Sequence, residues 1–160
     1  MAESSGVDVL GRVASGLYIV TCAGASQNHG FLASWIVQAG FKPPAVSVAI
    51  KQDRPILRDL KPGSIFCVNL LGKNDSGKKL MGAYARGFEI GQDAFEGQSM
   101  AEAANGGHYL MDALGYMECR LVRLVEPSTE HNLVIGEIVS GEMLAEDEPW
   151  VHIRKSGANY

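Results

Sequence analysis

The apolar residues of this chain fall mostly in short runs that have the length and composition of β-strands. Residues 17–22 are rich in β-branched and aromatic side chains, residues 45–50 form a similar run, and residues 64–71 are almost continuously apolar. β-Branched and aromatic residues favour strands, and a continuous apolar run indicates a strand that is covered on both faces. Further strands are predicted over three longer ranges and one short one: 31–39, 115–126, 131–146 and 150–154.

Helical spacing of apolar residues is confined to a few short segments. Residues 7–14 show it near the amino terminus, and Gly16 is expected to end this helix in a left-handed conformation. Residues 55–60 begin with a proline that suits the first turn of a helix, and residues 75–84 show helical spacing again. The glycine- and alanine-rich stretch 88–107 has no firm periodicity and is expected to be mostly loop.

The order of these elements predicts a mainly β fold. Five to seven strands with few helices and short hairpin turns indicate an antiparallel sheet that is closed or nearly closed. The two longest predicted strands exceed the usual length in a small barrel, so they are expected to bend or bulge at Gly136 and Gly141. A length of 160 residues predicts one domain over 1–160, large enough to fold without disulfides or metal.

Composition and charge argue against several kinds of partner. The formal net charge is −4, which offers no electrostatic basis for binding nucleic acid. No apolar run approaches the roughly 18 residues that a membrane span needs. Cys22, Cys67 and Cys119 stand singly in apolar runs, so they are expected to be buried free thiols in a reducing compartment, and a cytoplasmic protein is predicted.

The common catalytic and nucleotide-binding motifs are missing. The sequence has no G-x-S-x-G for a nucleophilic serine, no G-x-G-x-x-G and no G-x-x-x-x-G-K-[ST]. Its four histidines have no paired spacing with one another or with acidic residues, so no metal site is predicted. A nucleophilic hydrolase, a Rossmann or P-loop nucleotide site and a metal centre are therefore disfavoured.

The most informative stretch is 30–51, which reads as two strands joined by a Pro-Pro turn. Ser34 and Trp35 interrupt the first strand, and the second strand runs into a charged cluster that contains Lys51 and Arg54. An apolar platform with polar groups at one edge and cations at its end suits a flat ligand with an anionic tail, such as flavin mononucleotide. The two cations and the first turn of the following helix could meet one phosphate, or they could be surface charges on a solvated loop.

The side chains at this interruption also have ordinary structural explanations that involve no ligand. A tryptophan in a strand is usually a core residue, and period two places Ala33 and Trp35 on one face with Ser34 on the other. The three share a pocket only if the strand is bulged there. His131 opens a long strand straight after a turn, where it is either a donor to a ligand at the barrel rim or an ordinary turn histidine.

Six segments resemble, in order and spacing, the flavin reductase family with the FMN-binding split-barrel fold. The resemblance spans nearly the whole chain and is greatest to the carboxy-terminal reductase module of cyanobacterial-type diflavin flavodiiron proteins. In that module Ala-Ser-Trp, Phe-Lys-Pro-Pro and a terminal His-x-Arg-Lys-x-Gly are familiar. The six segments are 16–21, 33–35, 41–44, 48–51, 66–71 and 131–137.

This resemblance implies a homodimer that binds FMN, or FAD, near its interface and reduces it by hydride transfer from NAD(P)H. Because the flavin carries the chemistry, no catalytic acid or base is expected, and His131 would at most orient the nicotinamide. The loop over 88–107 is the expected cover of the open flavin face. Carried over by position, the cofactor-binding residues are Leu32, Ala33, Ser34 and Trp35 at the ring and ribityl chain, Ala49, Ile50 and Lys51 along the flavin, and Lys51 with Arg54 at the phosphate.

Three hypotheses follow for the function. The first is an NAD(P)H:flavin oxidoreductase, either free-standing or the reductase domain of a flavodiiron protein that passes electrons to oxygen or nitric oxide. The second is a non-catalytic electron-relay module in which the same barrel holds FMN without a productive nicotinamide site. The third is a dimeric structural barrel that binds no flavin.

Overall fold

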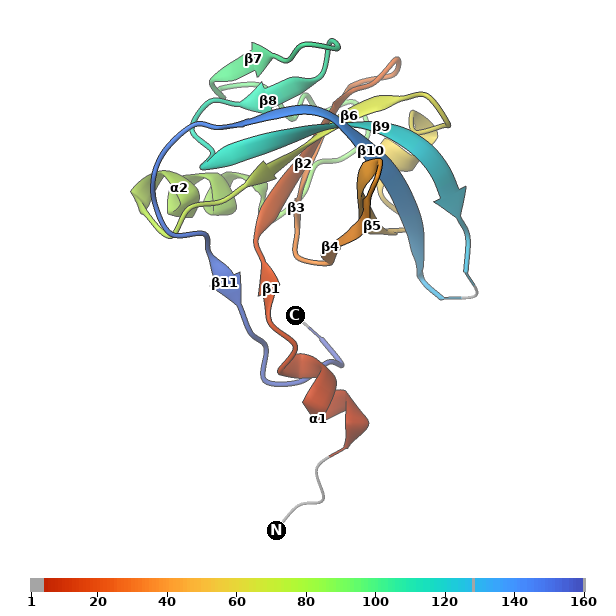
Figure 1. The fold of residues 1–160 in the computed structure, drawn as a ribbon, viewed down its shortest axis with the longest axis vertical. Coiled ribbons are helices and arrows are strands. Elements are labelled where there is room, and N and C mark those ends of the chain that lie inside the picture. Colours follow the sequence, from red (N-terminus) through yellow and green to blue (C-terminus); the bar gives the residue numbers. More distant parts are fainter. Residues whose placement is uncertain (1–4, 128, 160) are drawn as a thin grey trace.

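The computed structural model describes residues 5–127 and 129–159, in which strands predominate (Figure 1). Ser128, in the predicted turn between the two longest strands, lies outside the described residues. The mainly β fold is confirmed. In chain order the elements are α1 (Gly6–Gly11), β1 (Ser15–Gly16), β2 (Tyr18–Ala23), β3 (Asn28–Ala33), β4 (Ile36–Phe41), β5 (Pro44–Lys51), the 3-10 helix η1 (Pro55–Arg58), β6 (Ile65–Leu70), α2 (Asp75–Tyr84), β7 (Met100–Glu102), β8 (His108–Leu110), β9 (Gly115–Val125), β10 (His131–Met143) and β11 (Val151–His152).

Seven strands form one antiparallel sheet whose two edge strands follow each other directly in the chain. The strand order is β3-β2-β6-β9-β10-β5-β4, so β3 lies at one edge and β4 at the other. Only Ser34 and Trp35 separate these two strands. The chain therefore steps from one edge of the sheet to the other, and the sheet curls into a barrel with no ladder between β3 and β4. We call this two-residue step the seam.

The seam corrects one prediction from the sequence. The single strand expected over 31–39 is two strands that pair with different partners, β3 with β2 and β4 with β5. Ser34 and Trp35 are not an irregularity within one ladder but the point where one ladder ends and another begins. The interruption of the apolar alternation at Ser34 and Trp35 was the sequence signal that marks this change of ladder.

The two ends of the chain pair with each other and form an arm that projects from the barrel (Figure 1). β1 pairs with β11 through Ser15 with His152 and Gly16 with Val151. The prediction that Gly16 ends a helix in a left-handed conformation is wrong, because α1 ends at Gly11 and Gly16 belongs to a strand. We call residues 5–16 and 151–159 together the terminal arm.

Two other local predictions differ from the structure. The stretch 88–107 is mostly loop as expected, but it contains β7, which pairs with β8. In the β9–β10 ladder the register shifts at Gly136, as predicted, and again between Ile138 and Ser140 rather than at Gly141. A Cβ at Gly136 would lie 2.7 Å from the Phe66 ring, so the chain approaches the core too closely there for a side chain.

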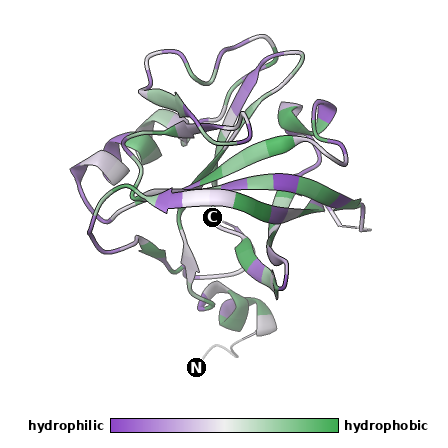
Figure 2. Ribbon diagram, turned by 45° about the horizontal axis from the view of Figure 1, so that its top comes forward, coloured by the Kyte–Doolittle hydropathy of each residue, from purple (hydrophilic) through white to green (hydrophobic). Residues whose placement is uncertain are grey.

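The core consists of two apolar clusters on the two faces of the central strands. Val20 of β2 points into the barrel, and the adjacent Ile19 points out toward Leu80 and Tyr84 of α2. Both faces of β6 are covered too, as its continuous apolar run predicted. Figure 2 shows apolar residues along these strands and also on α1, outside the barrel. In the described parts of the chain, no helix is long and apolar enough to cross a membrane.

The three cysteines are free and buried, as predicted. Burial raises the pKa of the Cys22 and Cys119 thiols to about 12, with the negative charges of Asp59 and Glu118 as the smaller causes. Thiols are therefore the stable form at neutral pH, and a thiol is a poor nucleophile.

Candidate functional site

The seam holds a buried hydroxyl group that lacks a partner. Ser34 is 3% exposed, and its Oγ has no hydrogen-bond partner among the described residues. A buried unsatisfied hydroxyl costs about 1–3 kcal/mol, so such groups are rare and call for a specific explanation. Because Ser34 lines two cavities, a ligand that spans them would supply the missing partner.

The first cavity lies between the terminal arm and the outer face of the barrel, and we call it the arm cavity. Its volume is about 420 Å³, and most of its wall is apolar. The terminal arm provides one side, through α1, the residues that follow it and Arg154, and strands β4, β5 and β10 provide the other. The principal lining side chains are Leu10, Val13, Trp35, Val37, Ala49 and Leu133.

The second cavity lies between the seam, Arg54 and α2, and we call it the helix cavity. Its volume is about 360 Å³, with an apolar wall that includes Leu32 and Met81. Arg54 and His152 are the basic side chains among its described lining residues. Arg54 precedes η1, and its guanidinium lies 5.1 Å from the centre of the Phe31 ring, which supports it by a cation–π contact.

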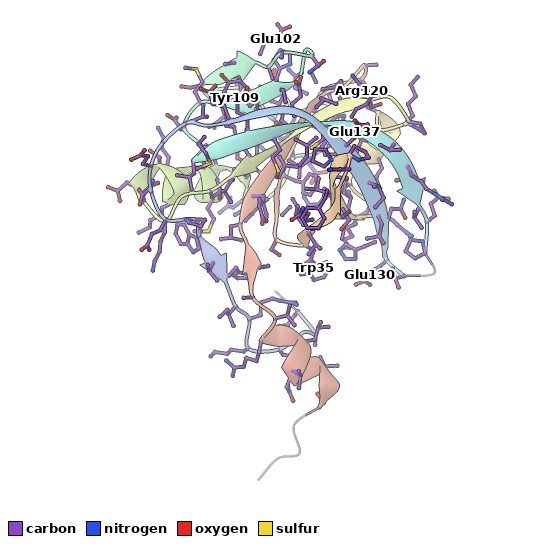
Figure 3. The ribbon with its side chains drawn as sticks, viewed as in Figure 1. Trp35, Glu102, Tyr109, Arg120, Glu130 and Glu137 are labelled. Carbon is purple, nitrogen blue, oxygen red and sulfur yellow. The ribbon has the colours of Figure 1, made fainter. Side chains whose placement is uncertain are left out.

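Trp35 forms a wall of the arm cavity and is held by side chains from two distant segments. Its ring centre lies 4.8 Å from that of His131, and the guanidinium of Arg154 lies 5.3 Å from the Trp35 ring centre. The backbone N–H of Arg154 donates to the Gly11 carbonyl at 2.9 Å, which fixes this part of the arm. Figure 3 shows Trp35 beside β4 and β5, on the side of the barrel from which the arm projects.

Six of the eight residues carried over by position line these cavities. Leu32, Ala33 and Arg54 line the helix cavity, Trp35 and Ala49 line the arm cavity, and Ser34 lines both. Ser34 and Trp35 share the arm cavity because the break between β3 and β4 suspends the alternation of a regular strand.

The other two carried-over residues lie elsewhere. Ile50 is 1% exposed inside the barrel core, because period two turns it inward between Ala49 and Lys51. Lys51 is exposed, and its Nζ lies 3.2 Å from a carboxylate oxygen of Asp53. Neither residue is among those that line the two cavities. His131 contacts Trp35 but does not itself line either cavity.

Sequence reasoning missed the contribution of the terminal arm. His152 lines the helix cavity and Arg154 lines the arm cavity, so the last strand and the segment that follows it flank the seam on both sides. The signal was present in the terminal His-x-Arg-Lys-x-Gly pattern, to which no role was assigned. The loop over 88–107, expected to cover the flavin, lines neither cavity.

Comparison with known proteins identifies the family of this chain. A family model described as flavin reductase like domain matches residues 10–159. The chain belongs to this flavin reductase family. Diflavin flavoprotein A 1 from Synechocystis sp. is 36% identical over 152 residues, which cover 94% of this chain and 26% of that protein. Putative diflavin flavoprotein A 1 from Thermosynechococcus vestitus is 37% identical with the same coverage. This flavin reductase domain spans about a quarter of the length of these relatives.

Solved structures share the fold of this flavin reductase family member. The NADH:FAD oxidoreductase SgcE6 of Streptomyces globisporus C-1027 superimposes with a TM-score of 0.80 at 22% identity, over 95% of this chain and 87% of that one. A putative flavin reductase from Haemophilus somnus 129PT gives a TM-score of 0.78 at 23% identity, over 92% of both chains. The predicted flavin reductase fold is thus confirmed.

The unpartnered hydroxyl leads to a test that needs no ligand. We expect Ser34→Ala to raise the free energy of unfolding of the flavin-free protein by about 1 kcal/mol, because it removes a buried polar atom without a partner. Urea denaturation followed by circular dichroism measures this change. Ser47→Ala in the same cavity is the control, since the Ser47 hydroxyl donates to the Val37 carbonyl at 3.4 Å and its loss offers no such gain. Destabilisation by Ser34→Ala would show that the hydroxyl is already satisfied.

Proposed function

We propose that this chain is an NAD(P)H:flavin oxidoreductase that binds FMN across the seam. The observation that carries the proposal is the buried, unpartnered Ser34 hydroxyl between an apolar cavity and a cavity that contains an arginine. FMN has the matching order of parts: a flat ring, a chain of hydroxyls and a phosphate. The ring occupies the arm cavity beside Trp35, Ser34 bonds the ribityl chain, and Arg54 binds the phosphate in the helix cavity.

The names of similar proteins support this assignment. The curated relatives are called diflavin flavoproteins, and the structural neighbour SgcE6 is an NADH:FAD oxidoreductase that has also been solved with NAD and FAD fragments. We favour FMN over FAD because the helix cavity has one described arginine, which suits a single phosphate. As a domain of a longer diflavin protein, the barrel would pass electrons to a flavodiiron core and on to oxygen or nitric oxide.

The residues of the site bind and orient, and the bound flavin supplies the capacity to accept a hydride and pass electrons on. Trp35 contacts both His131 and Arg154, which hold its ring in place, so it presents a rigid wall against which flat rings can be aligned. Correct alignment of two reactants contributes strongly to rate even without an acid or base. His131 acts by holding Trp35 and by limiting where the nicotinamide can lie.

The activity test is an absorption titration with FMN, followed by anaerobic addition of NADH or NADPH. We expect a shifted flavin spectrum on binding and bleaching of the visible flavin absorbance by at least one of the two nucleotides. Binding without bleaching by either nucleotide would favour the non-catalytic relay module. Absence of both effects would refute the proposed function.

The phosphate assignment makes a separate prediction about two neighbouring cations. We expect Arg54→Gln to weaken FMN binding about 10- to 100-fold and to leave riboflavin binding unchanged, because a charge-assisted hydrogen bond to phosphate is lost. Lys51→Gln is the matched control and should change FMN affinity less than about twofold, because an exposed, salt-bridged lysine contributes little. Fluorescence titration of both ligands measures the effects. Equal weakening of FMN and riboflavin by Arg54→Gln would remove the phosphate assignment.

We also propose a homodimer in which a second copy covers the mouth of the arm cavity. Val13, Val37 and Leu133 line this cavity and are 63%, 66% and 38% exposed. Exposed apolar side chains that gather around one cavity are typical of an interaction surface. Light scattering should give twice the chain mass for the native protein and for Val122→Lys, a control position on β9 that is 54% exposed. Val37→Lys should shift the mass toward the monomer, and a monomeric native protein would contradict the proposal.

A further inference from the structure

A buried histidine–aspartate pair lies behind Arg54 and has no role in the proposed chemistry. His29 of β3 is 4% exposed, and its Nε2 lies 2.6 Å from Oδ2 of Asp59. The same carboxylate oxygen accepts hydrogen bonds from the Ser26 hydroxyl at 2.5 Å and the Ser26 backbone N–H at 3.3 Å. Burial opposes ionisation of Asp59, but these hydrogen bonds and His29 outweigh it and lower its pKa, so Asp59 is a carboxylate.

The carboxylate determines which nitrogen of His29 carries a hydrogen. An ionised aspartate can only accept, so Nε2 of His29 must donate to it. In a neutral imidazole the other nitrogen, Nδ1, is then an acceptor. Within residues 5–127 and 129–159, no hydrogen-bond partner of His29 Nδ1 is present. The pair therefore presents an oriented acceptor on the side of the ring away from Asp59.

A small cavity connects this histidine with Arg54. His29 and Arg54 both line it, together with Phe31 and Phe88, and its volume is about 20 Å³. A cavity of this size holds one water molecule where polar groups face it, and His29 and Arg54 are polar groups of its wall. Arg54 also lines the helix cavity, so its side chain borders both the small cavity and the site proposed for the phosphate.

Two other neighbours of the Arg54 guanidinium are apolar. Its guanidinium lies over the Phe31 ring on one side. On another side it lies so close to Gly87 that a Cβ there would be 2.9 Å from Nη1. No ion pair to Arg54 is found among the described residues. A water held by His29 would offer the guanidinium an acceptor where its other neighbours offer an aromatic face and a glycine.

We propose that His29 is a positioning residue for Arg54, acting through one water molecule in the small cavity. The water accepts a hydrogen bond from the Arg54 guanidinium and donates one to Nδ1 of His29, whose Nε2–H donates to Asp59. This chain of hydrogen bonds holds the guanidinium with its remaining N–H groups directed into the helix cavity. The inference rests on the proposed function, since it assumes that Arg54 binds the flavin phosphate.

The test compares FMN with riboflavin, which lacks the phosphate. We expect Asp59→Asn to weaken FMN binding about fivefold and to leave riboflavin binding unchanged, because a neutral amide no longer obliges Nε2 of His29 to carry the hydrogen. Nδ1 is then no longer a fixed acceptor for the water. His29→Gln should have a similar effect. In an Arg54→Gln background neither change should weaken FMN further, because both act through Arg54.

A second buried carboxylate provides the matched control. Glu118 is fully buried and accepts hydrogen bonds from Asn105, Gly107 and Ser140. Glu118→Gln should lower the midpoint of thermal unfolding but leave the ratio of FMN to riboflavin affinity unchanged. A change in that ratio equal to the change caused by Asp59→Asn would show a general effect of destabilisation and overturn the inference.

The unmodified protein gives an independent measurement if these variants fail to fold. Long-range proton–nitrogen NMR distinguishes the two tautomers of His29, and we expect a hydrogen on Nε2 and none on Nδ1. A hydrogen on Nδ1 would overturn the inference. If Arg54→Gln affects FMN selectively but Asp59→Asn and His29→Gln do not, the inference fails and the proposed phosphate site stands. If Arg54→Gln affects FMN and riboflavin equally, both fail.

Discussion

The structure depends on how a seven-stranded sheet closes without a ladder between its edge strands. β3 and β4 are joined covalently by two residues, but no backbone hydrogen bonds run between them in the described sheet. Edge strands left in this way need other partners, because unpaired edges are a liability. The terminal arm, Arg54 and α2 lie around this break, and their side chains line the two cavities that meet at Ser34. The site is thus a consequence of incomplete closure.

The strands were predictable because most of the information is local. Period-two alternation in β5 is enough to explain why Ala49 lines a cavity, Ile50 is in the core and Lys51 is in solvent. The same reasoning, applied strictly, would have removed Ile50 from the candidate site. The resemblance carried Ile50 over by position and took no account of which face its side chain occupies. The alternation of side chains along a strand therefore serves as a check on the residues that a family resemblance assigns to a site.

The terminal arm was not predictable in this way because it depends on pairing between the two ends of the chain. β1 and β11 have two residues each, too few for a periodic signal, and they lie more than 130 residues apart. Their pairing brings His152 and Arg154 to opposite sides of the seam. A short motif near the carboxy terminus could be noticed in the sequence, but its place in the site could not be derived from local rules.

Stability and binding make opposite demands on the seam. Apolar side chains at the junction of β3 and β4 would stabilise the fold most. The chain instead places a hydroxyl there that has no partner among the described residues. Burying such a group costs free energy that the core must offset. Beside it, Arg54 packs against the Phe31 ring and Trp35 packs against His131, so polar and aromatic side chains are held in fixed positions. Such a junction lowers the stability of the empty barrel but suits a ligand site. Its side chains are already ordered, so they lose little conformational entropy when a ligand binds.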